Sequence, residues 1–382
     1  MKKIGIITIQ RSEVNYGACL QCYALWSHIN ENLGSCQVID LLRPCHTKYI
    51  YSRGMGEKPK MSTRQKIRQF VYNLFRQNTL TKEEQERLKK FREFNDKVQY
   101  SSSFRSVESL YKNIPDYDVY VSGSDQIWNP NMPFMNQPYL LEFVADGKKR
   151  ISYASSFGVD KIDDISKTMY KYLLTKYSYI SVREETGAQI VEEILGQRPQ
   201  VVLDPVFLLN REEWTTRQRQ PDKFIKEKYI LLYMLKYNKI ALKKASELAK
   251  KKGLKLYVVL SENRTIETPL AKQLINIGPA EWLWLIDNAE TMLTTSFHGT
   301  AFSIIFKTPV IALIEQGKPT NSRLQTLLSR FGLQELVVDI NAFDVNVEHD
   351  YNNLFDSLTL TYERECNRAK DFLTKAITDD KN

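Results

Sequence analysis

The stretch MLTTSFHGTAFSIIFKTPVIALI, residues 292–314, alternates strand and helix signals over a short distance. Its compact apolar ends, residues 292–295 and 310–314, are typical of buried strands, and residues 300–306 between them are typical of a buried helix. A strand, a helix and a second strand in this order form the unit from which parallel sheets are built. The stretch therefore predicts an α/β fold, with a polar turn where the first strand passes into the helix.

The same alternation extends through the rest of the chain, and Gly253 and Gly332 each follow a predicted helix at the position where glycine commonly ends one. The further predicted strands are residues 4–9, 38–42, 119–122, 151–154, 180–182, 201–203, 229–234, 256–260 and 336–338. The further predicted helices are residues 17–33, 240–252, 280–288, 322–331 and 351–375. We therefore expect one doubly wound parallel sheet in each half of the chain.

The length of the chain also favours two domains. At about 150 residues per domain, 382 residues correspond to two compact units. A polar stretch at residues 210–228 predicts the boundary, so we place a first Rossmann-like domain at residues 1–215 and a second at 216–345, followed by a helical segment at 346–382. Two such sheets in tandem leave a cleft where the carboxyl ends of their strands meet, and ligands bind there.

Positive charge is concentrated in one segment. The net charge is +9, and residues 53–97 hold thirteen basic and six acidic residues, which is +7 of that total. A basic face attracts nucleic acid, anionic lipid or phosphorylated substrates. The chain has no basic strand with interleaved aromatic residues of the kind that binds RNA or DNA, so we expect no nucleic-acid partner.

Within this basic segment the spacing predicts an amphipathic helix. Apolar residues recur at helical spacing, and basic residues are interleaved with them. The apolar set is Ile67, Phe70, Val71, Leu74 and Phe75, and the basic set is Arg64, Lys66, Arg68 and Arg76. One interpretation is a helix packed on its own domain; the other is a surface that binds anionic lipid or a lipid-linked substrate.

Cysteine use and the apolar runs indicate the compartment. The cysteine number is odd, five, and no secretory leader precedes them, which is typical of a reducing cytoplasm. Cys19 and Cys22 form a C-x-x-C pair without a second pair to complete a zinc site, so we expect buried thiols and no metal. No apolar run approaches the roughly 18 residues of a membrane span. We expect a cytoplasmic protein, with peripheral contact to the inner face of the membrane as the hypothesis attached to the basic segment.

A polar turn with a glycine follows the first predicted strand. Asn15, Tyr16 and Gly17 lie between that strand and a helix, an arrangement that binds anions or sugars at the helix N-terminus. Gly17 would let a ligand approach the backbone closely. Many turns between strands and helices contain glycine, so an ordinary turn is the alternative.

A second polar turn follows the predicted strand at residues 119–122. Asp125 and Gln126 can hydrogen-bond to sugar hydroxyls, and Trp128 can stack on a sugar ring through its apolar face. Ser124 adds a hydroxyl to the same turn. The alternative is a turn capped by Asp125 before a helix.

Charged residues follow the predicted strands at residues 180–182 and 201–203. Arg183 would point into the cleft, where a guanidinium can hold a carboxylate or phosphate with two hydrogen bonds. A surface ion pair of Arg183 with Glu184 or Glu185 is equally compatible with the spacing. Asp204 follows the second of these strands, and Pro205 after it favours a simple turn cap.

His298 lies in the polar turn of the opening stretch and is one of only four histidines. Ser296 precedes it, Gly299 permits close approach, and the Thr300 hydroxyl can cap the helix. A helix N-terminus favours an anion, and an imidazole beside a bound phosphate can act as acid or base near neutral pH. A structural histidine is the alternative.

Two further cations, Lys318 and Arg323, follow the strand at residues 310–314 and open the next helix. They are candidate anion ligands for the same reason: each lies close to a helix N-terminus at the carboxyl end of a strand.

Seven blocks of this sequence, taken in order, resemble the polysaccharide pyruvyl transferase family. They are NYGACLQCYAL (15–25), VSGSDQIWNP (121–130), SYASSFG (152–158), SVREETG (181–187), VLDPVFLL (202–209), GPAEWLWLIDNAE (278–290) and TTSFHGTAFSIIF (294–306). The resemblance rests on their joint order and spacing over nearly the whole chain. One departure matters: better-understood members carry Arg-Leu-His where this chain has Ser296-Phe297-His298, and that arginine helps to bind the donor. Arg323 or Lys318 would compensate.

The resemblance implies a GT-B-like architecture, with the site between two Rossmann-like domains and a final helix that crosses back to the first. It also implies a reaction of surface-polysaccharide biosynthesis, in capsule, exopolysaccharide or cell wall. Phosphoenolpyruvate donates its three-carbon unit to two hydroxyls of one sugar, which is free, nucleotide-linked or lipid-linked, and a pyruvate ketal forms without cofactor or metal.

The same resemblance implies roles for the polar turns. His298 would be the acid or a phosphate ligand, Arg183 a clamp for the donor, and Lys318 and Arg323 secondary anion ligands. The turns at residues 15–17 and 124–128 would hold the sugar. Two other functions stay open: a nucleotide-sugar glycosyltransferase that uses residues 315–323, and a non-catalytic binding protein of the same pathway.

Overall fold

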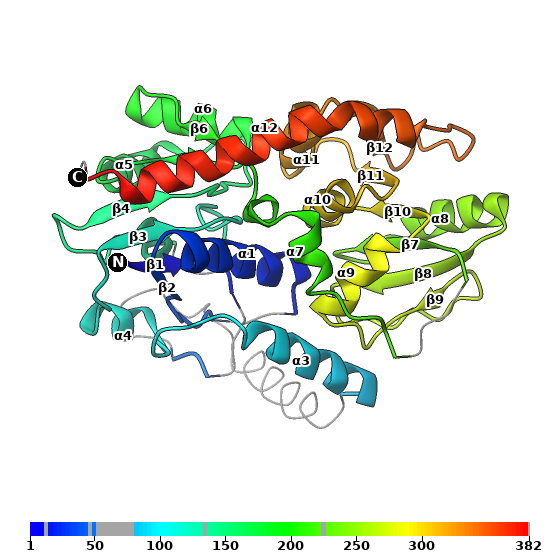
Figure 1. Cartoon of the computed structure of the whole chain (residues 1–382), viewed down its shortest axis with the longest axis horizontal. Coiled ribbons are helices and arrows are strands. Elements are labelled where there is room, and N and C mark those ends of the chain that lie inside the picture. The colour runs from blue at the N-terminus through cyan, green and yellow to red at the C-terminus, as the bar shows by residue number, and fades with distance from the viewer. Residues whose placement is uncertain (11–13, 45–47, 51–79, 133–135, 223–226, 381–382) are drawn as a thin grey trace.

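The computed structural model describes residues 1–10, 14–44, 48–50, 80–132, 136–222 and 227–380. The predicted basic helix at residues 64–76 lies outside them. The described residues form two parallel sheets with helices on their faces, side by side in Figure 1. None of the helices in these ranges is both long enough and apolar enough to cross a membrane.

The first sheet has the strand order β2-β1-β3-β4, all parallel. A separate pair, β5-β6, continues beyond β4 through bridges from Ile151 to Tyr179 and from Ser155 to Val182. The strands are β1 (Lys3–Ile7), β2 (Ser35–Val38), β3 (Val119–Ser122), β4 (Lys149–Ser152), β5 (Ser181–Val182) and β6 (Gln200–Val201). The helices are α1 (Tyr16–Asn32), α3 (Lys82–Asn95), α4 (Val107–Lys112), α5 (Asp164–Leu174), α6 (Glu185–Leu195) and α7 (Arg211–Thr215), with 3-10 turns η1 (Gln137–Leu140) and η2 (Pro205–Leu208).

The second sheet has the order β12-β11-β10-β7-β8-β9, again all parallel. This is the doubly wound order, in which the direction of winding reverses between β7 and β10. The strands are β7 (Tyr229–Met234), β8 (Lys255–Leu260), β9 (Lys272–Gln273), β10 (Thr291–Thr294), β11 (Val310–Ile314) and β12 (Val337–Asp339). The helices are α8 (Lys239–Lys252), α9 (Pro279–Asp287), α10 (Phe297–Phe306), α11 (Asn321–Arg330) and α12 (Tyr351–Thr378), with the turn η3 (Gln334–Leu336).

One local expectation was wrong. The second strand ends at Val38, where it was expected to begin, because the following apolar run pairs with a different segment: Leu42 N donates to Phe104 O over 2.9 Å. The polar stretch at residues 210–228, where the sequence placed the domain boundary, begins with α7, whose Trp214 is fully buried and donates its indole N–H to Val206 O over 2.9 Å.

Helix α12 joins the two halves on one side of the molecule. It starts beside the second sheet and runs back over the first, as its red ribbon in Figure 1 shows. At its end, Lys2 Nζ donates to Ile377 O over 3.0 Å, and the ring of Phe372 packs against Tyr153 at a centroid distance of 6.5 Å. The final helix therefore packs on the first sheet, as the family resemblance implies.

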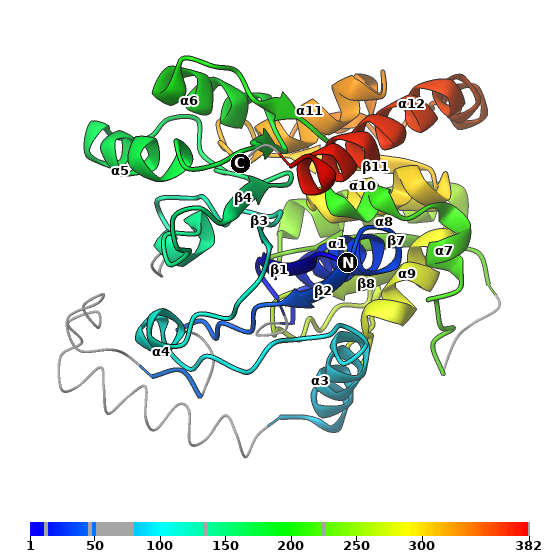
Figure 2. The same cartoon turned by 60° about the vertical axis from the view of Figure 1, so that its left-hand side comes forward.

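Helix α3 joins the two halves on the opposite side (Figure 2). Helix α3 has acidic residues in its first turn and a basic residue in its last turn, and it starts with a capping box between Thr81 and Glu84. Arg87 donates to the carbonyl of Leu260 at the end of β8 over 2.8 Å. The described part of the basic segment therefore packs against both halves of the chain.

The first turn of α1 is buried in the second half of the chain. The ring of Tyr16 stacks on Trp282 at 5.2 Å between centroids, meets the edge of Tyr233 at 5.7 Å and lies 4.9 Å from Phe91. Its hydroxyl donates to Ile277 O over 2.8 Å. One hydrophobic core thus runs continuously from the first sheet into the second.

The docking of α3 depends on a buried ion pair that can be tested. Glu281 of α9 is 1% exposed, and it pairs with buried Lys90 at 3.1 Å and with half-exposed Arg219 at 2.6 Å. Replacing Lys90 with Met should lower the free energy of unfolding by roughly 3 kcal/mol, because a buried carboxylate loses its buried partner. Urea denaturation followed by fluorescence measures this.

The matched control is Lys89→Met on the same helix, where the ammonium is 75% exposed and 3.8 Å from Glu93. It should change the free energy of unfolding by less than about 1 kcal/mol. Equal effects of the two substitutions would show that the Lys90–Glu281 pair does not hold α3 in place.

Candidate active site at the domain boundary

Polar residues from both halves meet at the carboxyl ends of the parallel strands. Arg183 follows β5, Asp204 follows β6 and Asp125 follows β3, while His298 follows β10 and Arg323 follows β11. In doubly wound sheets this edge is the usual place for a ligand. The sequence predicted convergence there, and the structure brings these five side chains together.

Arg183 lies at the centre of the cluster and is 3% exposed. Its NH1 donates to Asp204 Oδ2 over 2.7 Å, and its NH2 lies 3.6 Å from Asp125 Oδ1. The ring of Phe297, from α10, lies against the guanidinium with 4.5 Å between centroid and Cζ, a cation–π contact. Burial alone would lower the pKa of Arg183, but the nearby carboxylates, Asp204 most strongly, outweigh it and raise the pKa above its ordinary value.

Asp204 is a shared acceptor, and it is 1% exposed. Its Oδ1 accepts from Val206 N over 3.2 Å, which is the turn cap that the sequence favoured. Its Oδ2 accepts from Arg183 NH1 and from Ser124 Oγ at 2.7 and 3.1 Å. The same oxygen lies 3.6 Å from His298 Nε2. Burial would raise the pKa of Asp204, but the adjacent His298 and Arg183 hold it well below its ordinary range, so the carboxylate is ionised.

His298 enters the site from the first turn of α10 and is 7% exposed. The helix begins earlier than expected because Ser296 is its N-cap: Ser296 Oγ accepts from Gly299 N over 3.4 Å. Thr300 lies inside the helix and donates its hydroxyl to Ser296 O over 3.2 Å. The predicted cap at Thr300 is therefore wrong, and both hydroxyls are engaged in holding the turn.

Two glycines that were expected to admit a ligand instead allow close packing. A Cβ on Gly17 would lie 2.0 Å from Nδ1 of His298, so only glycine lets the imidazole rest against the first turn of α1. A Cβ on Gly299 would lie 2.6 Å from Thr294 Oγ1, so this glycine brings α10 onto β10. Asn15, next to the first of these turns, caps α1 by accepting from Ala18 N over 3.2 Å.

Arg323 reaches the cluster from the first turns of α11. The side-chain oxygen of Gln126, oriented toward it, accepts from both terminal nitrogens of the guanidinium at 2.8 Å each. Burial, together with the positive charge of Arg183, lowers the pKa of Arg323 to about 10, and the neighbouring carboxylates only partly offset this. Arg323 is therefore the less well compensated of the two guanidinium groups.

Glu184 is a site residue that sequence reasoning treated only as a surface partner of Arg183. Its side chain is fully buried, and Oε1 accepts from Ser156 Oγ and Phe157 N at 2.9 Å each and from Gly158 N at 3.3 Å. The SYASSFG block carried a signal for this loop, since its small residues follow β4. The carboxylate thus fixes that loop beside the two arginines.

Backbone strain marks the same edge of the first sheet. Asp125 (φ 72°) and Ala154 (φ 50°) adopt the left-handed conformation directly after β3 and β4. Such conformations cost about 1–3 kcal/mol in residues other than glycine and cluster at functional sites. Burial would raise the pKa of Asp125, but the neighbouring Arg183, His298 and Arg323 lower it below its ordinary value.

Three predicted ligands lie elsewhere. Trp128 is fully buried and donates its indole N–H to Ser122 Oγ over 3.0 Å, so it offers no face for a sugar. Tyr16 is fully buried in the shared core. Lys318 is exposed and pairs with Glu315 of its own turn at 2.7 Å. An indole or a phenol can serve either a core or a sugar site, and only tertiary packing decides between them.

Several buried polar atoms of the cluster have no hydrogen-bond partner within the described residues. They are Nε and NH2 of Arg183, Nε of Arg323, Nε2 of His298 and Oε2 of Glu184. Buried polar groups are normally satisfied, and exceptions often mark functional positions. Four of these five atoms belong to cationic or potentially cationic groups, which indicates an anionic ligand.

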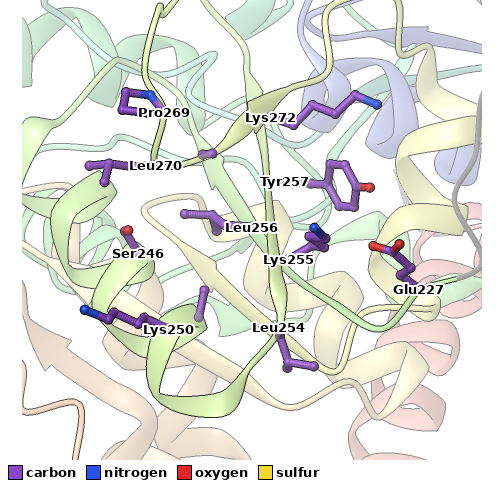
Figure 3. Close-up of a pocket in the computed structure, with 12 residues that line it drawn as sticks. Glu227, Ser246, Lys250, Leu254, Lys255, Leu256, Tyr257, Pro269, Leu270 and Lys272 are labelled. Atoms are coloured by element: carbon purple, nitrogen blue, oxygen red, sulfur yellow. The ribbon is translucent and has the colours of Figure 1, made fainter.

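A hollow of about 610 Å³ lies away from this cluster (Figure 3). It is lined by Leu254, Lys255 and Tyr257 near the amino end of β8 and by Lys250 at the end of α8. The functional edge of the sheet is the opposite one, so this hollow is not part of the candidate site. Within the described ranges, no cluster of three or more His, Cys, Asp or Glu side chains could hold a metal ion.

Two Rossmann-like sheets with a polar site at their boundary define the GT-B architecture. A putative UDP-N-acetylglucosamine 2-epimerase from Listeria monocytogenes has the same fold at 9% identity, with a TM-score of 0.54 over 99% of this chain and 97% of that chain. The UDP-GlcNAc 2-epimerase of Methanocaldococcus jannaschii gives a TM-score of 0.50 at 13% identity, over 97% of this chain and 99% of that one. At such identities the likeness shows the fold alone.

The family is shown by a sequence model rather than by these structures. The polysaccharide pyruvyl transferase model matches residues 15–316, which is most of the chain. The protein belongs to the polysaccharide pyruvyl transferase family, and the resemblance carried by the seven blocks is confirmed. No curated protein sequence matches the chain.

The contact between Gly17 and His298 gives a prediction. Gly17→Ala should lower transferase turnover about 10²-fold, because the added methyl group displaces the imidazole by an ångström or more. A lower thermal midpoint would not be explained by helix propensity, because alanine favours the helix over glycine by about 1 kcal/mol. In a His298→Ala background the same substitution should cause no further loss. Wild-type turnover in Gly17→Ala would show that the contact does not set the position of the imidazole.

Proposed function

We propose that the protein transfers the three-carbon unit of phosphoenolpyruvate to two hydroxyls of one sugar, forming a pyruvate ketal and releasing phosphate. The observation that carries the proposal is the meeting of Arg183 and Arg323, from opposite halves of the chain, beside His298. Their N–H groups that have no hydrogen-bond partner among the described residues suit a small ligand with several negative charges.

The positive charge of Arg323 is only partly compensated, which supports phosphoenolpyruvate as the donor. Phosphoenolpyruvate carries a carboxylate and a phosphate on adjacent atoms. Two guanidinium groups, each able to form paired hydrogen bonds with such anions, match that pattern. The carboxylates that surround Arg183 would repel a donor on that side, so Arg323 is the stronger anion ligand and Arg183 orients it.

The proposed chemistry uses His298 as the acid. A proton from the imidazolium goes to the methylene carbon of the donor, which leaves an electrophilic centre at C2. One sugar hydroxyl bonds to C2 and loses its proton; the C2–O bond to phosphate then breaks, and the second hydroxyl bonds to C2 and loses its proton in turn. One of the two hydroxyl protons returns to the imidazole, and the other leaves with phosphate.

The sugar would approach from the first sheet. Asp125 lies at the turn after β3 in an ionised state, and a carboxylate there can accept hydrogen bonds from the reacting hydroxyls. Gln126, whose oxygen is used by Arg323, connects the sugar side to the donor side. A separate assay with different acceptors would identify the sugar and show whether it is lipid-linked.

Donor choice is tested by ligand stabilisation. Phosphoenolpyruvate at 100 times its Kd should add about 2.7 kcal/mol of stability, which raises the thermal midpoint by several degrees. Uridine and guanosine diphosphates at the same concentration should not. Phosphate release should then appear on adding galactosyl, mannosyl or N-acetylmannosaminyl acceptors. Stabilisation by the diphosphates alone would contradict pyruvyl transfer and favour a nucleotide-sugar glycosyltransferase on the same scaffold.

The role of Arg323 is tested by substitution. Arg323→Gln should weaken binding of phosphoenolpyruvate about 10–100-fold, because a charge-assisted contact is lost. Lys318→Gln is the matched comparison, since this exposed lysine pairs with Glu315 of its own turn. It should change the Kd by about twofold at most. A larger effect of Lys318→Gln than of Arg323→Gln would indicate that the donor binds at the exposed turn that holds Lys318. Isothermal calorimetry measures both.

A further inference from the structure

One carboxylate oxygen serves both halves of the site. Asp204 belongs to the turn after β6, and its Oδ2 faces Arg183 of the same half and His298 of the other half. We propose that Asp204 is a positioning residue that orients the imidazole of His298 and the guanidinium of Arg183 for the reaction. Its effect on catalysis rests on the pyruvyl transfer proposed above.

The imidazole lies between the two halves of the chain. Nδ1 faces the first turn of α1 at Gly17, and Nε2 faces Asp204 Oδ2 at 3.6 Å. Because 3.6 Å is longer than a hydrogen bond, the carboxylate orients the ring through its charge, and Nε2 stays available to a ligand. Because Asp204 and His298 come from different sheets, the ring is oriented only when the two halves are docked.

The guanidinium of Arg183 is oriented by the same oxygen. NH1 donates to Asp204 Oδ2 over 2.7 Å, and the ring centroid of Phe297 lies 4.5 Å from Cζ of the guanidinium. These two contacts leave Nε and NH2 without hydrogen-bond partners among the described residues. Asp204 therefore decides which N–H groups of Arg183 can meet a ligand.

Ser124 supports the carboxylate. Its hydroxyl lies 3.1 Å from Asp204 Oδ2 and 2.9 Å from Ala154 O, and the side chain is fully buried. The sequence predicted Ser124 as a sugar ligand, whereas its contacts in the protein are with the group that orients Arg183 and His298. The VLDPVFLL block thus contributes Asp204, which acts through Arg183 and His298.

The experiment compares Asp204→Asn with Glu281→Gln. Both remove one buried carboxylate charge at the junction of the two halves, but Glu281 pairs with Lys90 and Arg219 and lies outside the site. Turnover, the KM for phosphoenolpyruvate, the thermal midpoint and the imidazole ¹⁵N spectrum of histidine-labelled protein are measured for each. With four histidines in the chain, His298→Gln assigns the relevant signals.

Asp204→Asn should lower kcat about 10²-fold with a smaller change in KM, because the acid is misplaced rather than the donor lost. It should also shift the ring signals of His298. Glu281→Gln should lower the thermal midpoint and leave kcat and those signals as in the wild type. The proposal is overturned if Asp204→Asn keeps the His298 signals, or if Glu281→Gln shifts them equally.

Two further outcomes are decisive. If wild-type protein releases no phosphate with any acceptor, pyruvyl transfer fails, while the His298 signals of Asp204→Asn still decide the positioning role. If Asp204→Asn does not fold, Ser124→Ala replaces it, because it removes one hydrogen bond to the same oxygen. Ser124→Ala should shift the His298 signals in the same direction by less, and unchanged signals would refute the proposal.

Discussion

The site depends on one contact, the burial of the first turn of α1 in the second half of the chain. Tyr16 is enclosed by Trp282, Tyr233 and Phe91, and burying an aromatic ring of this size removes about 150–250 Å² from water. Gly17, the next residue, is thereby pressed against the imidazole of His298. The docking of the two halves consequently also places the imidazole of His298, and α3 and α12 contact both halves on opposite sides of the molecule.

The balance of charge in the cluster explains why it should take up an anion. Taking guanidinium and carboxylate groups out of water is costly unless each has a close partner. Arg183 has Asp204 at 2.7 Å and Asp125 at 3.6 Å, whereas the close partner of Arg323 is the neutral amide of Gln126. A negatively charged ligand would complete the charge compensation that the protein gives Arg323 only in part.

Sequence periodicity predicted the sheets well, because buried strands are short, apolar and bounded by turn residues. The observed bounds of β3, β7 and β11 are the predicted ones, and the edge of the sheet where the polar residues gather was predicted from strand ends. Helices α5 and α6 were not predicted, although both carry buried residues at helical spacing: Tyr170, Leu173 and Leu174 in α5, and Ile190, Val191 and Ile194 in α6. The partners of Asp204 come from segments distant in sequence, and local pattern carries no information on such contacts.

The turn before α10 has a different task in this chain from the one its family resemblance implies. Ser296 stands where an arginine was expected, and its hydroxyl is engaged in the N-cap, so it supplies no charge. Phe297 contributes a ring beneath Arg183. The cation comes from the next strand–helix unit, because β11 pairs directly with β10 and brings the start of α11 to the same edge. Gln126 connects Arg323 to the first sheet, and under the proposed function Arg323 would supply the positive charge that the turn before α10 lacks.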